Sequence, residues 1–117
     1  MSTNALFIEE LLRLLPQLKS IYNEHLADND DTLLPHVFMG DVTRFVIAET
    51  KKSKRRDILQ RLFVHLEEGL KGGPKEVKEL IVVSFVENLT GETAVLKTIK
   101  PLMRPLLKKE IEAICGE

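Results

Sequence analysis

The sequence has no tryptophan, one tyrosine and one cysteine among its 117 residues. A lone cysteine, Cys115, cannot close an intramolecular disulfide, which excludes a disulfide-stapled secreted domain. No apolar run comes near the roughly 20 residues of a membrane-spanning helix, and the N-terminus shows no signal-peptide pattern. We therefore expect a cytoplasmic protein without a membrane segment.

Motifs for catalysis and metal binding are also missing. The three histidines, His25, His36 and His65, lie far apart in sequence, and none stands in a metal-binding spacing such as His-Glu-x-x-His. No glycine-rich phosphate-binding loop is present either. These absences predict a protein that is not an enzyme and that uses no cofactor or metal.

Apolar spacing predicts helices along most of the chain. From residue 7 to residue 26, apolar residues recur every three or four positions, which is the period of an amphipathic helix. Pro16 interrupts this stripe, and because the stripe continues beyond it, we expect one kinked helix rather than two separate ones. Pro35 fits the first turn of a second helix, and a third helix ends at Gly72-Gly73.

The C-terminal part of the chain adds a central helix and a shorter tail of helices. The segment from about 75 to 89 is apolar on nearly every side, as expected of a buried central helix. Pro101 and Pro105 interrupt the remainder, which makes one or two further helices. The sequence thus predicts an all-α fold, in which residues 1–117 form a single-domain bundle of five or six helices.

In residues 34–46, polar side chains interrupt an apolar helical pattern. The segment reads Leu-Pro-His-Val-Phe-Met-Gly-Asp-Val-Thr-Arg-Phe-Val. A helix brings Asp41 within reach of Arg44, and Gly40 would let another helix approach closely. The polar face of segment 83–89 is expected to complete a buried network, in which an inward-facing Arg44 and Glu87 would have to pair. We favour this structural role over catalysis for the whole group, which comprises His36, Asp41, Arg44, Glu87 and Asn88.

The same segment, together with Val-Ser-Phe-Val-Glu-Asn-Leu at 83–89, resembles a poorly characterised family of small all-helical bacterial proteins. The rest of the chain matches that family in helical pattern and length. Some members are suspected immunity proteins of bacterial toxins. The resemblance therefore implies a helical, non-catalytic protein whose partner is a cognate toxin domain.

Acidic residues are concentrated near the N-terminus. Residues 1–31 hold six acidic and two basic residues, although the net charge of the whole chain is only −1. Toxin nucleases carry basic clefts, and opposite potential speeds association, so an immunity protein is expected to bind through its acidic surface. We predict that this surface consists of Glu24, Asp28, Asp30 and Asp31. The alternative is a solvated turn without a binding role.

A basic run supports a second hypothesis from another functional class. Residues 51–61 hold six bases and one acid, and residues 97–109 add five bases without an acid. In a small nucleic-acid-binding or regulatory protein, phosphate contacts would come from Lys51, Lys52, Lys54, Arg55 and Arg56. The nearly neutral net charge and the scarcity of aromatic residues argue against this hypothesis. Binding to a protein partner is the favoured interpretation.

Overall fold

The computed structural model describes residues 3–52 and 56–115, and within these ranges it contains helices and no strands. The all-α prediction is confirmed, but the predicted count of five or six helices is wrong because the described chain contains seven α-helices. They are α1 (Thr3–Leu14), α2 (Lys19–Asp28), α3 (Pro35–Lys52), α4 (Asp57–Gly72), α5 (Lys75–Ile81), α6 (Thr93–Ile99) and α7 (Pro105–Cys115).

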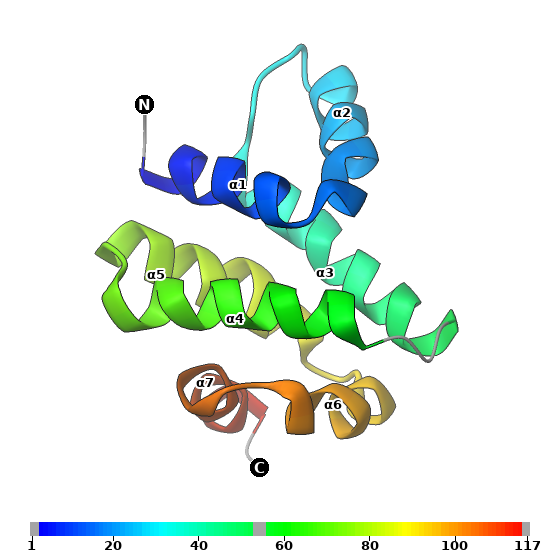
Figure 1. The fold of residues 1–117 in the computed structure, drawn as a ribbon, viewed down its shortest axis with the longest axis vertical. Helices are drawn as coiled ribbons and strands as arrows, with labels where there is room; N and C mark the ends of the chain where they lie inside the picture. Colours follow the sequence, from blue (N-terminus) through cyan, green and yellow to red (C-terminus); the bar gives the residue numbers. More distant parts are fainter. Residues whose placement is uncertain (1–2, 53–55, 116–117) are drawn as a thin grey trace.

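The additional helix arises at Pro16, where the expected kink is wrong and two separate helices form. Leu15 leaves the helical region, with φ −130° and ψ 78°, because a proline ring disfavours α conformation in the residue before it. A short 3₁₀ turn, η1 (Pro16–Leu18), then leads into α2. The apolar stripe continues across the break because Leu15 and Leu18 are both fully buried, although the helix axis changes direction (Figure 1).

The predicted central helix over 75–89 is helical throughout, but it is not one uniform α-helix. After α5, the chain widens into a π-helical turn, η2 (Val82–Val86), and tightens into a 3₁₀ turn, η3 (Glu87–Leu89). Most apolar side chains of the segment are buried, whereas Val83 is 47% exposed. The segment therefore supplies core residues and leaves part of one face at the surface. Single-turn π insertions of this kind are rare.

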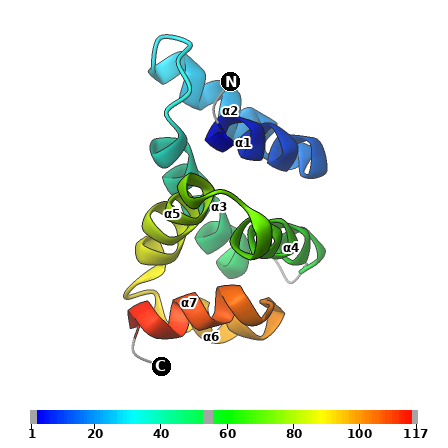
Figure 2. The same ribbon diagram turned by 90° about the vertical axis from the view of Figure 1, so that its left-hand side faces the viewer.

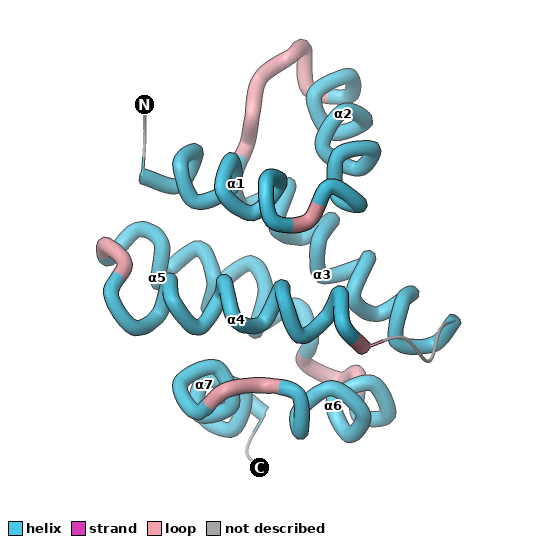
Figure 3. Tube along the Cα trace, in the orientation of Figure 1, coloured by secondary structure: helices cyan, strands magenta, loops and turns pink. Residues whose placement is uncertain are grey.

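Three layers stack along the long axis of the molecule, as the two perpendicular views show (Figure 1; Figure 2). The α1 and α2 helices form one end, α6 and α7 form the other, and α3, α4 and α5 lie between them. One apolar cluster runs through all three layers, and the rings of Phe63 and Phe85 meet edge to face at a centroid distance of 6.3 Å. The longest connection between described helices joins α2 to α3 (Figure 3).

Close packing of the layers depends on Gly69 rather than on Gly40. A Cβ atom at Gly69 would lie 2.8 Å from Ile81 Cδ1 and 2.9 Å from Phe7 Cε1, which is too close on two sides. At Gly40 a Cβ atom would meet nothing nearer than 3.7 Å. The predicted close helix approach at Gly40 is therefore wrong, and α1 and α5 approach α4 at Gly69 instead.

None of the described helices combines the length and apolarity needed to cross a bilayer.

Candidate functional site

The polar motif of α3 meets the central segment at Ser84, which is buried. The His36 Nδ1 atom lies 2.5 Å from the Ser84 hydroxyl oxygen. The Ser84 carbonyl accepts hydrogen bonds from the Asn88 amide at 2.8 Å and from the Thr43 hydroxyl at 3.1 Å. Thr43 is itself buried, and its hydroxyl also lies 2.9 Å from the Met39 carbonyl. Two predicted network residues, His36 and Asn88, are thus joined through Ser84.

The charged residues of the predicted network lie outside this cluster. Asp41 forms an ion pair with Arg44, as the spacing predicts, but the Arg44 side chain is 69% exposed. Glu87 is exposed as well, and no ion pair joins it to Arg44 in the described residues. The predicted buried pairing of Arg44 with Glu87 is therefore wrong. Position 44 falls beside the buried stripe of α3, which contains Val42 and Val46, rather than within it.

His25 is the buried polar residue that links α2 to the motif. Its Nε2 atom accepts a hydrogen bond of 3.0 Å from the Leu34 backbone N–H, and its Nδ1 atom lies 3.3 Å from the Asn29 amide nitrogen. That Nδ1 atom lies 3.9 Å from Asp41 Oδ2. The Asn29 amide donates to the His25 carbonyl at 2.7 Å and fixes the end of α2. His25 thereby holds the α2–α3 connection against the start of α3.

An acidic pocket of about 340 Å³ opens beside His25, between α2 and α3. Three carboxylates and one guanidinium contribute a formal charge of −2 to its wall. The structure thus joins two groups that the sequence placed apart: Glu24 and Asp28 from the predicted partner-binding surface, and Asp41 and Arg44 from the predicted network. We call this the acidic pocket, and it is lined by Ile21, Glu24, His25, Asp28, Asp41, Arg44 and Phe45.

The remaining two predicted partner-binding residues, Asp30 and Asp31, lie in the turn that follows α2 and do not line the acidic pocket. Both are exposed, and both adopt left-handed backbone with φ values of 53° and 59°. Aspartate tolerates this conformation better than most residues because its short side chain can hydrogen-bond locally. The Asp31 N–H donates to the Leu26 carbonyl at 2.8 Å, which closes the helix end. Asp30 and Asp31 therefore have a structural role in the turn.

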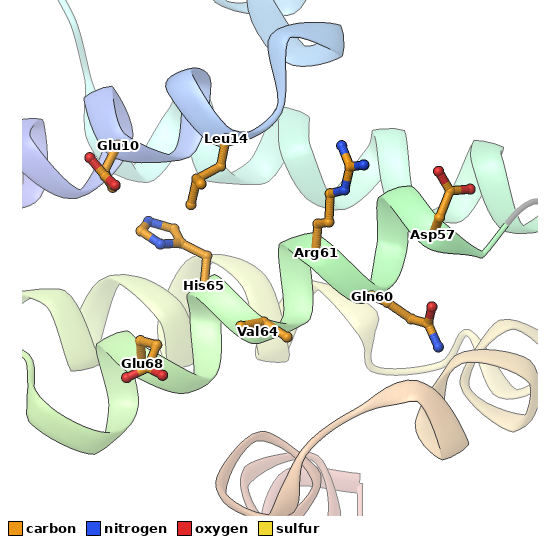
Figure 4. Close-up of a pocket in the computed structure, with 8 residues that line it drawn as sticks. All are labelled: Glu10, Leu14, Asp57, Gln60, Arg61, Val64, His65 and Glu68. Atoms are coloured by element: carbon orange, nitrogen blue, oxygen red, sulfur yellow. The ribbon is translucent and has the colours of Figure 1, made fainter.

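A second, larger hollow lies between α1 and α4 and was not expected from the sequence. It encloses about 690 Å³, and Figure 4 shows its lining side chains. We call it the α1–α4 groove, lined by Glu10, Leu14, Asp57, Gln60, Arg61, Val64, His65 and Glu68. Its α4 residues follow the helical spacing i, i+3, i+4, i+7, i+8 and i+11, which is a second stripe beside the buried one. That spacing marks one face of α4 in the sequence, but it does not show that α1 forms the opposite wall.

His65 lines the α1–α4 groove and ties the two helices together. Its Nε2 atom lies 3.1 Å from the Phe7 carbonyl and can donate to it, and its ring stacks on the Phe7 ring with a centroid distance of 4.3 Å. Burial lowers the pKa of His65 below its ordinary value. The Phe7 carbonyl and the carboxylates of Glu10 and Glu68 act in the opposite direction but do not overcome the loss of hydration.

The residues of the alternative phosphate-binding hypothesis lie around the junction of α3 and α4. Lys51 and Lys52 are exposed at the end of α3, and the Lys51 ammonium lies 4.0 Å from a Glu92 carboxylate oxygen. Arg56 directly precedes α4. Lys54 and Arg55 lie outside the described residues. One member of the run is thus partly neutralised by Glu92, which directly precedes α6.

Among the described residues, no group of three or more histidine, cysteine, aspartate or glutamate side chains is placed to hold a metal ion.

Comparisons with known proteins identify a family but no characterised relative. No curated protein matches the chain, and no solved structure matches it. The model of one family, described as a domain of unknown function (DUF7674), matches residues 8–116. The chain therefore belongs to this family of unknown function.

Proposed function

We propose that this chain is a non-catalytic, cytoplasmic binding protein of the immunity type, which neutralises a cognate bacterial toxin by occluding the toxin's active cleft. The acidic pocket is the observation that carries the proposal. It gathers Glu24, Asp28 and Asp41 in one concave wall, with Arg44 as the single opposing charge. A basic side chain from a partner would find several carboxylates there at once.

Opposite potentials across an interface raise the association rate and select against wrong partners. In this chain, the carboxylates of Glu24 and Asp28 stand on α2, while Asp30 and Asp31 extend the negative surface along the following turn. A toxin that acts on RNA or DNA requires a basic cleft to hold its substrate. A protein that covers this cleft with carboxylates competes with the nucleic acid for the same cations.

The acidic pocket also supplies apolar contact area and a rigid frame. Ile21 and Phe45 line it and are half-buried, so each has surface left for a partner. Apolar anchors surrounded by polar groups carry much of the energy of protein interfaces. Because α2 and α3 are already held together through His25, binding requires little ordering of the chain, and less binding energy is lost to entropy.

The proposal is tested by co-expressing this chain with the product of the gene immediately upstream in its own genome. We expect the neighbouring protein to arrest growth when expressed alone, and we expect this chain to restore growth and to co-purify with it. A harmless neighbour, or restored growth without a complex, would contradict the pairing. Retention on immobilised nucleic acid that is lost steeply with added salt would favour the phosphate-binding hypothesis instead.

A further inference from the structure

His25 is a titratable residue buried in the wall of the acidic pocket. It is only 3% exposed, and its ring packs against the Phe38 ring at a centroid distance of 5.8 Å. Both ring nitrogens face hydrogen-bond donors: Nε2 lies 3.0 Å from the Leu34 backbone nitrogen, and Nδ1 lies 3.3 Å from the Asn29 amide nitrogen. That amide nitrogen also donates to the His25 carbonyl at 2.7 Å, which fixes its orientation. These surroundings suit a bare ring nitrogen rather than a second ring proton.

A second proton on His25 is incompatible with the hydrogen bond to the α2–α3 connection, residues 29–34. The neutral imidazole ring has one bare nitrogen that accepts a hydrogen bond, whereas the protonated ring carries a hydrogen on both nitrogens. In the protonated state, the Nε2–H group would oppose the Leu34 N–H, donor against donor. The Asp31 N–H still donates to the Leu26 carbonyl, so the effect is confined to the part of the connection next to α3 (Figure 3).

Protonation of His25 also changes the charge of the acidic pocket. Four charged residues line the pocket with His25, namely Glu24 and Asp28 from α2 and Asp41 and Arg44 from α3. Asp41 is nearest, because its Oδ2 atom lies 3.9 Å from Nδ1, and Arg44 already pairs with the same carboxylate. Asp30 and Asp31, in the connection, are exposed, so solvent screens their charges. The additional proton raises the formal charge of the lining from −2 to −1.

We propose that His25 is a pH-sensitive latch of the acidic pocket. The neutral ring holds the α2–α3 connection to α2, and the protonated ring releases the connection and weakens the binding of a basic partner. The effect on binding rests on the proposed function of the pocket as a site for basic side chains. Because the proton and the basic partner both add positive charge beside Asp41, each lowers the affinity of the pocket for the other. A falling pH therefore releases the partner, and a bound partner keeps His25 neutral.

The latch is tested on the chain alone by nuclear magnetic resonance. At neutral pH we expect a scalar coupling across the hydrogen bond between the Leu34 amide nitrogen and His25 Nε2. On acidification this coupling should disappear with the same midpoint as the titration of the His25 ring nitrogens. The hydrogen-exchange protection of the Leu34 amide should fall about tenfold across that midpoint, as expected for the loss of one hydrogen bond. A coupling that persists while His25 titrates would overturn the latch, and so would a ring that stays neutral until the chain unfolds.

Two histidine variants identify the residue that is responsible for the pH dependence. His25→Gln keeps an acceptor for the Leu34 N–H but does not titrate, so its Leu34 protection should not change across the wild-type midpoint. His65→Gln, in the α1–α4 groove, is the matched control and should keep the wild-type pH dependence. The same pH dependence in His25→Gln as in wild type would assign the change to another group and overturn the proposal. Circular dichroism checks folding, and the wild-type titration needs no variant.

The effect on binding is measured by isothermal titration calorimetry with a hexa-arginine peptide, above and below the midpoint of His25. We expect wild type to bind the peptide about fivefold more weakly below the midpoint, and His25→Gln to show a smaller change. An equal change in both proteins would overturn the effect of the latch on binding. Absence of peptide binding at either pH would contradict the pocket as a site for basic partners, and with it this effect. The resonance experiment is independent of the peptide, so failure of the latch and failure of the proposed function are distinguishable.

Discussion

Helices α3 and α4 both lie in the middle layer of the molecule, and each carries polar residues among apolar ones (Figure 2). On α3, His36 and Arg44 are exposed, and Thr43 is the buried polar residue. On α4, Glu67 is buried, and His65 ties the helix to α1 through the Phe7 carbonyl. The conspicuous polar motif thus lies largely at the surface, while a less conspicuous helix holds the layers together through polar groups.

Glu67 illustrates how a polar residue becomes structural through distant contacts. Its two carboxylate oxygens accept the backbone N–H groups of Leu106 and Leu107, each at 2.9 Å. These donors belong to the first turn of α7, where helical N–H groups have no partner within their own helix. A negative charge at that position also complements the helix dipole. One side chain of α4 therefore caps a helix about 40 residues further along the chain.

The largest expected effect follows from removing this cap. Glu67→Ala leaves two partly or fully buried N–H groups without an acceptor and should lower the free energy of unfolding by about 2–3 kcal/mol. Glu79→Ala removes an exposed carboxylate from α5 and should change stability by less than about 0.5 kcal/mol. Urea denaturation followed by circular dichroism measures both. Equal stability of the two variants would show that Glu67 does not hold α7.

The second expected effect contrasts the glycines of the two helices. Gly69→Ala forces Ile81 and Phe7 apart and should destabilise the fold by about 1–3 kcal/mol. Gly40→Ala meets only ordinary contacts and improves helix propensity, so it should be neutral or stabilising by up to about 1 kcal/mol. Thermal unfolding of the pair gives the comparison directly. The same sign of change in both variants would mean that close packing does not distinguish these positions.

A smaller effect is expected at the buried polar residue of α3. Thr43→Val keeps the shape of the side chain but removes the hydroxyl that lies within hydrogen-bonding distance of the Met39 and Ser84 carbonyls. We expect a loss of about 1 kcal/mol, the usual net value of one hydrogen bond, because each carbonyl keeps another partner or partial solvation. The control is Thr98→Val, because the Thr98 hydroxyl of the wild type is exposed. A loss no greater than that of the control would make the Thr43 bridge energetically neutral.

The smallest effect is the pH dependence that His65 adds. Its folded-state pKa is lowered by burial, so the unfolded chain binds the proton more readily. The stabilisation from His65 is therefore complete above its unfolded pKa of about 6.5 and is lost as the pH falls through the lower folded value. His65→Gln retains a donor for the Phe7 carbonyl but does not titrate. Between neutral and mildly acidic pH, denaturation should show a smaller loss for His65→Gln than for wild type, and an equal loss would contradict this account.

Local sequence patterns were sufficient to predict most of the helices but not the side on which each polar residue falls. Pro35, Gly72 and the periodic apolar residues indicate helix limits because their effects act within a few positions. Pro16 was misjudged because the apolar stripe continues through a change of axis, and a stripe does not distinguish a kink from a turn. Arg44 was misjudged, and Glu67 was not singled out, for a related reason. Burial of a polar group depends on which distant element covers it, and spacing along one helix does not contain that information.

The acidic pocket and the α1–α4 groove also differ in how much of each the sequence predicts. Glu24 and Asp28 were identified because acidic residues cluster in sequence, and the fold added Asp41 by bringing α3 against α2. The α1–α4 groove lies between two helices that are far apart in the sequence, with 42 residues between Leu14 and Asp57. No local pattern therefore reveals the depth of the groove. The second stripe on α4 was nevertheless visible as a repeat of three- and four-residue steps.

The most direct test of the proposed function is the association rate with the co-purified toxin partner, measured by stopped flow at low and high salt. The variant Glu24→Lys/Asp28→Lys is preferable to reversal at Asp30 or Asp31, where the left-handed backbone would add strain to the turn. We predict that it associates about tenfold more slowly or worse than wild type at low salt, with the difference shrinking as salt rises. An association rate equal to that of wild type at low salt would contradict a toxin interface at the acidic pocket.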